Sequence, residues 1–332
     1  MRFELPPGAL EVLRRLNAAG YQAYAVGGCV RDLARGVPPH DYDICTSALP
    51  AQTERCFAGE RVVKTGIKHG TVTVLMAGEP YEITTFRTDG DYLDGRHPQS
   101  VAFTDSLTED LRRRDFTINA MALAPDGSVL DPFGGRADLA RRLIRCVGEP
   151  ERRFTEDALR MLRAVRFAAQ LGFSLEARTA AALASCAPLL ERVSGERIRA
   201  ELEKTLLSPH PSLAALPVEL GMLARFGAPA RQVELSALAA LPATPAHRWG
   251  AFCAATGLDI ARLPVERALR RAVLHPEDRE LAALAVTGRD LYDLGLRGGD
   301  IGRTRWALLE HVRAHPGDNQ REFLLSLAKE RT

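Results

Sequence analysis

The 332-residue sequence lacks the features that mark several whole classes of protein. It contains no run of about 18 apolar residues, so a transmembrane helix is not expected. Its opening, MRFELPPGAL, has a glutamate and two prolines where a secretion signal needs an apolar run. Glycine and proline, at 27 and 20 residues, are far below collagen-like or low-complexity levels. A chain that is 46% hydrophobic and 26% charged is instead typical of a globular protein with two or three domains, which we expect to be cytoplasmic.

Cysteine and histidine are also sparse in the patterns that bind metals. The six cysteines include no CxxC pair, which argues against a zinc site or a disulfide framework and favours reduced thiols. No His-Asp phosphohydrolase motif and no Gly-x-Ser-x-Gly occurs. His311 and His315 are four residues apart, a metal-ligand spacing, but no third ligand accompanies them in the sequence. For this pair we expect a solvated helix face.

Lysine is scarce, because only four of the 44 basic residues are lysines. The excess of arginine reflects either genome composition or phosphate recognition, and composition alone does not separate the two. Residues 141–199 hold twelve arginines and seven acidic residues. This segment is therefore predicted to offer a phosphate-binding surface for RNA.

The hydrophobic pattern predicts an α+β N-terminal part followed by an all-α C-terminal part. The expected elements are a helix at 8–19, strands at 21–26 and 41–45, a hairpin of 71–76 with 81–86, a long loop at 87–108, strands at 115–123 and 128–133, and helices from 136 onward. The glycines and polar residues of 90–100 predict that this part of the loop is mobile without ligands.

The first chemical motif combines a glycine pair with two aspartates. Gly27 and Gly28 follow a predicted strand, where the backbone can approach a phosphate, and Arg31 lies close behind them. Asp41 and Asp43 alternate along the next strand, so both should lie on one face. Two neighbouring carboxylates repel unless a cation lies between them, and Mg²⁺ prefers such oxygen ligands together with phosphate. The motif therefore predicts a site for Mg²⁺ and a nucleotide.

GGCVRD followed by DYDI resembles the signature of the tRNA nucleotidyltransferase and poly(A) polymerase family, and the chain looks most like its class II, CCA-adding members. The resemblance covers roughly 20–205 and 285–328. It continues through ITTFRTDGDYLDGRHPQSVAF, DLRRRDFTINAMA, DPFGGRADL, EDALRMLRAVRF and, near the C-terminus, GRDL and GGDIG. It implies a polymerase β-type nucleotidyltransferase head with a mixed sheet, followed by an all-α neck, body and tail. We expect these at 1–140, 141–205, 206–285 (shorter than in most relatives) and 286–332.

The resemblance also implies an activity: template-independent addition of CCA to the 3′ end of tRNA from CTP and ATP. Pyrophosphate is released by a two-metal transfer that uses Mg²⁺. The implied partners are tRNA and the two nucleotides, with no membrane and no protein partner. The loop around 90–100 is expected to help switch specificity from C to A. A-adding or CC-adding relatives, a poly(A) polymerase and a catalytically inactive RNA-binding module are the alternatives.

The segment EDALRMLRAVRF carries a more specific argument about base choice. One acid and three arginines recur at a spacing of three residues and should follow one helix face: Asp157, Arg160, Arg163 and Arg166. The single acid can pair with one arginine, which would leave two arginines to bind nucleotide phosphates. Cytosine and adenine both present an amine donor beside a ring-nitrogen acceptor, whereas guanine and uracil present the reverse. Asp157 accepting from the amine and Arg160 donating to the ring nitrogen would select C and A.

The candidate site residues fall into two groups. Asp41 and Asp43 are the expected catalytic metal ligands, and Glu82 on a neighbouring predicted strand is a third carboxylate that the sequence leaves open. The resemblance places Arg114 and Asp115 at the sugar and phosphates of the nucleotide. The expected nucleotide-binding residues are Gly28, Arg31, Arg114, Asp157, Arg160, Arg163 and Arg166.

Overall fold

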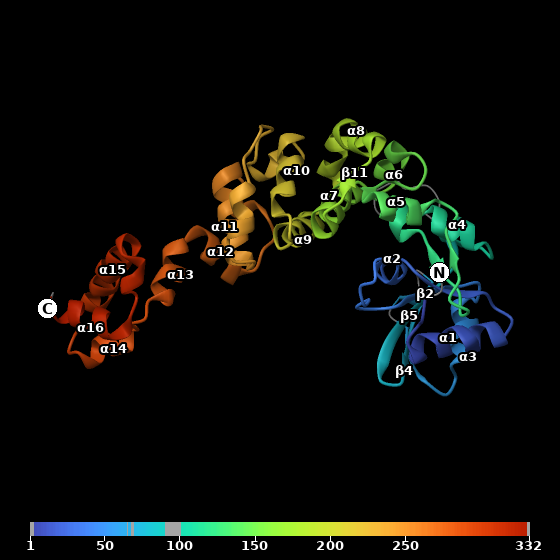
Figure 1. The fold of residues 1–332 in the computed structure, drawn as a ribbon, viewed down its shortest axis with the longest axis horizontal. Coiled ribbons are helices and arrows are strands. Elements are labelled where there is room, and N and C mark those ends of the chain that lie inside the picture. The colour runs from blue at the N-terminus through green and yellow to red at the C-terminus, as the bar shows by residue number, and fades with distance from the viewer. Residues whose placement is uncertain (1–2, 65, 68–69, 90–100, 331–332) are drawn as a thin grey trace.

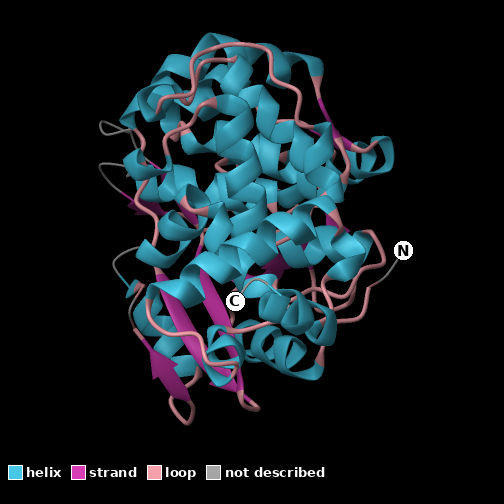
Figure 2. Cartoon of the chain, turned by 90° about the vertical axis from the view of Figure 1, so that its left-hand side faces the viewer, coloured by secondary structure: helices cyan, strands magenta, loops and turns pink. Residues whose placement is uncertain are grey.

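A computed structural model describes residues 3–64, 66–67, 70–89 and 101–330. The molecule is an elongated arch, with the N-terminal part at one end and the C-terminal helices at the other (Figure 1). Longer strands lie together at one end and helices form most of the rest (Figure 2). In the described part of the chain, every helix is too short or too polar to cross a lipid bilayer. The predicted α+β head followed by a helical remainder is confirmed.

The head is built on one mixed sheet of seven strands in the order β3-β4-β5-β2-β1-β8-β9. All neighbours are antiparallel except β2 and β5, which run parallel. The strands are β1 (Ala23–Val26), β2 (Asp43–Thr46), β3 (Arg61–Val63), β4 (Thr71–Met76), β5 (Glu79–Thr85), β8 (Ala122–Leu123) and β9 (Val129–Leu130). The predicted β4–β5 hairpin is confirmed, and its turn residues Ala77 and Gly78 both have positive φ, as a type I′ turn requires.

Helices cover both faces of this sheet. The predicted first helix is confirmed as α1 (Pro7–Ala18), and its buried residues recur at helical spacing: Ala9, Val12, Leu13 and Leu16. This face packs with Phe57, which follows α3 (Pro50–Cys56), against Ile44 and Ile83 of the sheet. On the opposite face, α4 (Leu107–Arg112) packs against β1 and β2, while α2 (Gly28–Ala34) follows β1 directly.

Two sequence predictions in the head were wrong in detail. The expected long loop instead begins and ends in paired strands, β6 (Arg87–Asp89) and β7 (Val101–Phe103), and α4 follows. The predictions of mobility and specificity switching at 90–100 fall outside the described residues. The expected strand at 115–123 is interrupted by a 3₁₀ turn, η2 (Thr117–Asn119), and only β8 joins the sheet.

The reason for the second error lies in helix α5 (Gly135–Arg141), which packs tightly against η2. A Cβ atom on Gly135 would lie 2.2 Å from the carbonyl oxygen of Thr117, so only glycine permits this approach. Thr117 also donates its hydroxyl hydrogen to the carboxylate of buried Asp138. Residues 115–117 therefore pair with 145–147 through an isolated antiparallel bridge, and the close packing of α5 against η2 accompanies the break in the predicted strand.

The helical part contains two cores. One extends from Ile144 to Val265 through the neck and body and also takes in Phe116 and Ile118 of the head. Its elements are β10 (Leu143–Ile144), α6 (Pro150–Glu156), α7 (Leu159–Leu171), β11 (Ser174–Leu175), α8 (Ala177–Cys186), η3 (Ala187–Arg192), α9 (Gly195–Leu206), η4 (Pro211–Ala214), α10 (Ala215–Glu219), η5 (Ala224–Phe226), η6 (Ser236–Ala240), α11 (Pro245–Thr256), η7 (Ile260–Arg262) and α12 (Arg267–Leu274). The division of this core into neck and body stays a prediction.

The tail has a separate core of eight buried residues between Leu284 and Ala328. It is formed by α13 (Pro276–Ala283), α14 (Gly288–Asp293), α15 (Gly299–Ala314), η8 (Pro316–Asp318) and α16 (Arg321–Glu330). The tail lies at the far end of the arch from the head (Figure 1). It therefore folds around its own apolar residues rather than against the sheet.

Candidate active site between head and neck

A cavity of about 480 Å³ opens where head and neck meet. It is lined by Gly27, Gly28, Arg31, Asp43, Arg113, Arg114, Asp115, Asn119, Asp157, Leu159, Arg160, Arg163, Phe167 and Arg197. These residues come from the end of β1, α2, β2, the α4–η2 segment, the start of α7 and the first turn of α9. The cavity therefore brings together eight of the eleven candidate site residues that the sequence singled out, all except Asp41, Glu82 and Arg166.

The glycine pair shapes the head side of the cavity. Gly27 has φ +79°, which favours glycine, and a Cβ there would lie 3.0 Å from the Nη1 atom of Arg114 and so crowd that side chain. Arg31 on α2 donates to both carboxylate oxygens of Asp32 at 2.9 and 2.8 Å and to Oδ1 of Asn119 at 2.9 Å. Its guanidinium also lies 5.3 Å from the ring centre of Phe167 on α7. Arg31 thus reaches from the head to the neck.

The carboxylates gather around Asp43, the first residue of β2. Glu82 lies beside it, because parallel β2 and β5 pair Ile44 with Ile83, the next residue of each strand. Burial raises the pKa of Asp43, the negative charges of Asp41 and Glu82 raise it further, and Arg114 opposes the shift. Asp41 precedes the strand, so the predicted alternation of Asp41 and Asp43 along one strand is wrong, and both residues keep exposed surface. A divalent cation bound at Asp43 would offset the repulsion that Asp41 and Glu82 exert on its carboxylate, and carboxylate oxygens are ligands that such a cation prefers.

Arg114 and Asp115 do not pair with each other. Arg114 donates to Asp110 at 3.4 Å; burial lowers its pKa, but the negative charges of Asp110 and Asp43 outweigh burial and raise the pKa above its usual value. Asp115 accepts from Nε of Arg163 at 2.8 Å and from the Asn119 amide at 3.2 Å. Burial alone would raise the pKa of Asp115, but Arg163 and these hydrogen bonds lower it to about 2. Although Arg114 and Asp115 are adjacent in the sequence, their side chains therefore face different parts of the cavity.

Asp157 is not part of the helix that the sequence predicted. Helix α6 ends at Glu156, Asp157 is extended with φ −146° and ψ 103°, and α7 begins at Leu159. The break arises because the Asp157 carboxylate accepts the backbone N–H of Leu159 at 3.1 Å, as aspartate does at helix starts. Its two oxygens also accept from Arg197 at 3.2 and 2.8 Å. Both Asp157 and Arg160 line the cavity.

Arg160 is held by protein groups on several sides. Its guanidinium donates to Glu156 at 2.7 Å, to the carbonyl of Arg153 at 3.2 Å and to the carbonyl of Arg113 at 3.1 Å. These bonds join the neck to the α4–η2 segment of the head and fix the plane of the guanidinium. The side chain is therefore oriented before any ligand arrives.

The expectation of two unpaired arginines on α7 was wrong, because acids distant in sequence provide their partners. Arg163 pairs with Asp115, and buried Arg166 donates to Glu201 of α9 at 2.5 Å and to Gln170 at 2.9 Å. Arg166 does not line the cavity. Sequence reasoning missed Arg197, Asn119 and Phe167 as cavity residues, and no local spacing could have linked Arg197 to Asp157, 40 positions away.

Comparison with known proteins agrees with this geometry. A family model described as "Poly A polymerase head domain" matches residues 23–145, and one described as "Probable RNA and SrmB-binding site of polymerase A" matches 172–226. The curated CCA-adding enzyme of Geobacillus thermodenitrificans is 46% identical over 305 residues, covering 87% of this chain and 74% of the relative. The chain belongs to the CCA-adding enzymes. The Geobacillus stearothermophilus CCA-adding enzyme is 47% identical over 304 residues, with the same coverage.

The structural comparison supports the same family. The crystal structure of the Bacillus stearothermophilus CCA-adding enzyme in complex with CTP matches with a TM-score of 0.68 and 34% identity, covering 98% of both chains. The recognition of this family from the sequence motifs, and the fold that it implied, are thus confirmed. A CCA-adding enzyme is a nucleotidyltransferase, and membership of this family implies use of a divalent metal ion, which the carboxylates around Asp43 fit.

Proposed function

We propose that this CCA-adding enzyme extends the 3′ end of tRNA without a template, using CTP and ATP and releasing pyrophosphate. The observation that carries the proposal is that one cavity holds both Asp43, whose pKa is raised by the charges of Asp41 and Glu82, and the fixed side chains of Asp157 and Arg160. The first group suits phosphoryl chemistry and the second suits base selection. The resemblance to a relative crystallised with CTP supports the same nucleotide.

For the chemistry, we assign Asp41 and Asp43 as ligands of Mg²⁺, with Glu82 as a third carboxylate. When bound, Mg²⁺ would lower the pKa of the attacking 3′-hydroxyl and stabilise charge on the phosphate oxygens. Gly28 offers a backbone N–H at the start of α2, and Arg31 offers a planar fork of donors, so both suit the triphosphate. Arg163 and Arg114 add positive charge on the walls where the sugar and phosphates would lie.

For base selection, the two residues act through what each can accept or donate. The Asp157 carboxylate is acceptor-only, and its Arg197 partner leaves further lone pairs for the amine of cytosine or adenine. Arg160 only donates and so suits the ring nitrogen of those bases. Guanine or uracil would bring a carbonyl toward Asp157 and an N–H toward Arg160, leaving buried polar groups unpaired. Because protein groups fix both side chains, no template base is needed.

For the RNA, a second cavity of about 650 Å³ lies where α2, α5, the end of α7 and His210 meet. The ionisable residues that line it are all basic: Arg35, Arg136, Arg142 and His210. Arg142 adopts φ +54°, a left-handed conformation that costs a non-glycine residue free energy. Part of this groove falls within the segment that matches the RNA-binding family model, which supports binding of the tRNA backbone here. The cytoplasmic location stays a prediction.

A direct experiment tests the activity. A tRNA that lacks its CCA end is incubated with CTP, with ATP, or with both in the presence of Mg²⁺, and the products are sequenced. We expect CC with CTP alone and CCA with both nucleotides. Addition of A only to tRNA that already ends in CC, addition of CC only, or an untemplated poly(A) tail would each replace the proposal with the corresponding relative's activity. An Asp43→Asn variant should add nothing.

A further inference from the structure

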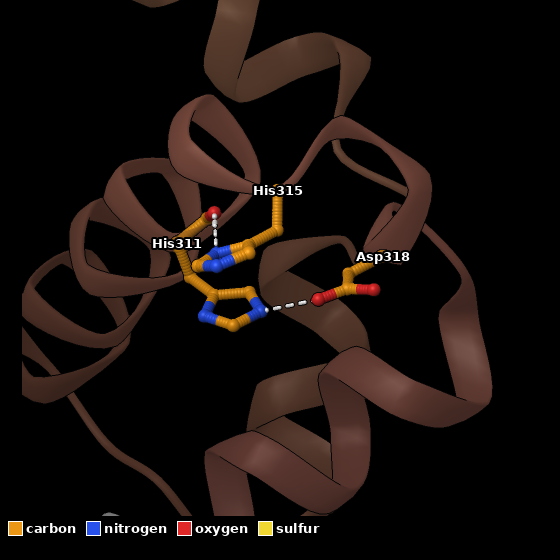
Figure 3. Close-up of side chains that lie close together, drawn as sticks. All are labelled: His311, His315 and Asp318. Carbon is orange, nitrogen blue, oxygen red and sulfur yellow. Dashed lines mark hydrogen bonds and ion pairs between the residues drawn. The ribbon is translucent and has the colours of Figure 1, made fainter.

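We propose that His311, His315 and Asp318 form a binding site for Zn²⁺ or a similar divalent transition metal in the tail, far from the nucleotide cavity. His311 lies on α15, His315 follows its last residue, and Asp318 ends η8. The chain turns at Pro316 and returns the aspartate to the two imidazoles (Figure 3). One potential ligand atom from each residue lies within 4.8 Å of the others, the only such group of three among the described residues.

The hydrogen bonds of His315 leave it in a form that can bind metal. Its Nδ1 lies 3.3 Å from the backbone carbonyl of His311, and a carbonyl can only accept, so Nδ1 is the protonated nitrogen (Figure 3). In the neutral ring, Nε2 then carries the lone pair. A ring N–H donated to a backbone carbonyl is the usual orienting bond of a metal-binding histidine.

His311 and Asp318 already lie at nearly the required separation. Nε2 of His311 is 2.8 Å from Oδ2 of Asp318, a hydrogen bond whose proton would be released to solvent when a metal ion binds. A tetrahedral zinc ion bonded to both atoms would hold them roughly 3.4 Å apart, so this pair needs to open by about half an ångström. Imidazole nitrogen and carboxylate oxygen are both common zinc ligands, and a water molecule would complete four-coordination.

The resting position of the His315 ring requires one adjustment. The two imidazoles stack with centroids 4.8 Å apart and planes 26° from parallel, so their nitrogens do not both aim at one point. His315 is exposed, whereas His311 is half-buried and lies 5.6 Å from the ring of Phe323 on α16. We therefore infer that His311 and Asp318 separate only slightly, and that the exposed ring of His315 makes the larger movement, turning onto the ion and giving up its hydrogen bond to the carbonyl of His311.

Metal binding here would join the end of α15 to the following turn. Asn319, next to Asp318, donates its side-chain amide to the carbonyl of Ala283 and accepts the N–H of Ala285 at 2.8 Å. The site thus connects α15 to the segment between α13 and α14. A bound ion should hold these elements together and raise the melting temperature of the tail.

The test uses untagged, EDTA-treated full-length protein with excess Mg²⁺ to occupy the head carboxylates. Zn²⁺ is titrated by calorimetry, and Co²⁺ is titrated by its visible absorbance, which intensifies on tetrahedral coordination. We expect the tail of the wild-type protein to bind one equivalent of metal. The affinity should be at least tenfold weaker in His315→Gln, and this binding should be absent in His311→Gln/His315→Gln. His275→Gln is the matched control, because His275 is also exposed and lies beside a carboxylate, at 3.2 Å, but has no third ligand among the described residues.

Two outcomes would overturn the proposal. One is wild-type protein that shows no stoichiometric binding up to millimolar metal, and the other is a double variant that binds as tightly as wild type. His315 is exposed, so His315→Gln should fold normally, and circular dichroism verifies this. Zinc should raise the melting temperature of wild type and of His275→Gln but not that of the double variant.

Discussion

At the residue scale, the most informative contact is the pairing of Asp157 with Arg197. Two charge-assisted hydrogen bonds fix both carboxylate oxygens, and the N–H of Leu159 fixes one of them again. Aspartate otherwise rotates easily at the start of a helix. Arg197 therefore acts as a positioning residue for the acceptor that we assign to base selection.

Arg197→Met should relax base choice. Without its partner, the Asp157 carboxylate can turn away from the base, and loss of such a hydrogen bond is worth about 1–3 kcal/mol. We expect the preference for CTP over UTP in kcat/KM to fall by roughly 5- to 150-fold, as in Asp157→Ala. Single-nucleotide assays on tRNA ending before CCA measure this.

Arg199→Met is the control, because Arg199 lies on the same helix but pairs with Glu203 and does not line the cavity. Its base preference should match that of wild type. An Arg197→Met enzyme with unchanged selectivity would place base choice outside the Asp157 carboxylate.

Asp43→Asn should stabilise the metal-free protein at neutral pH while it stops nucleotide addition. The pKa of Asp43 is raised by burial and by Asp41, so the folded state holds this proton more tightly than the unfolded state does. The free energy of unfolding therefore falls as pH rises from the ordinary pKa through the raised one, and the ionised form costs stability above both. Thermal unfolding in EDTA between pH 4 and pH 8 should show a higher melting temperature for Asp43→Asn than for wild type at neutral pH. This difference should shrink as the pH is lowered.

Asp105→Asn, on an exposed aspartate, serves as the control for loss of one negative charge. Mg²⁺ should reduce the difference between Asp43→Asn and wild type, because it stabilises only the ionised site. A variant that melts below wild type in EDTA at neutral pH would contradict the assignment of repulsion at Asp43.

At the element scale, α7 serves two purposes on different faces. Arg160 and Arg163 face the cavity, whereas Arg166 faces α9 and is buried beside Glu201. The regular three-residue spacing of the arginines thus reflects one helix that supplies both a binding wall and a packing contact. A buried ion pair of this kind is costly to break by removing one partner.

Arg166→Met should destabilise the fold with little direct effect on nucleotide binding. It leaves the Glu201 carboxylate buried, with Arg163 as a more distant partner at 3.8 Å. We expect a loss of about 3–5 kcal/mol in the free energy of unfolding, measured by urea denaturation. The double variant Arg166→Met/Glu201→Leu should recover most of this loss, since it removes the unpaired charge.

Two comparisons make this prediction specific. Arg199→Met, which removes a partly exposed ion pair of α9, should cost about 0–1 kcal/mol in the free energy of unfolding. Near saturating tRNA, the KM for CTP should remain close to that of wild type in Arg166→Met. A large rise in the KM for CTP without loss of stability would contradict this prediction and would support a role for Arg166 in nucleotide binding.

At the scale of the whole molecule, the arch places the nucleotide cavity and the basic groove on either side of α2. Arg31 lies over Phe167 of α7, while Arg35, one turn further along α2, lies 6.0 Å from the ring centre of Phe173. Head and neck therefore meet along α2, with the reactive end of the RNA expected at one end and its backbone at the other.

Arg136→Ala/Arg142→Ala should weaken tRNA use without changing nucleotide use. Removal of each arginine that binds a phosphate should weaken RNA binding and reduce the slope of log affinity against log salt by about one. We expect the KM for tRNA to rise roughly tenfold at physiological salt, while the KM for CTP stays unchanged. Arg14→Ala, on an exposed arginine of α1, is the matched control. An equal slope of log affinity against log salt in the double variant and in wild type would show that the groove does not bind the RNA.

Much of the site could be predicted from the sequence because its chemistry lies in short local patterns. Residue type and spacing indicate the chemistry of three short motifs: the glycine pair after a strand, the two aspartates and the EDALR segment. The amphipathic α1 and the β4–β5 hairpin are likewise encoded locally by apolar period and turn residues. The family and the α+β order of the fold followed from these patterns.

Tertiary structure alone decided which charges face each other. Asp115 pairs with Arg163 across 48 positions, Arg166 with Glu201 across 35, and Asp157 with Arg197 across 40. The spacing of arginines along a helix gives no information about acidic residues that other elements bring close in space. The sequence prediction therefore left two arginines unpaired. Similarly, Asp318 reaches His311 and His315 only because the chain turns at Pro316. Local sequence thus determined the reactive groups, and long-range packing decided their partners, because ion pairs depend on distance in space.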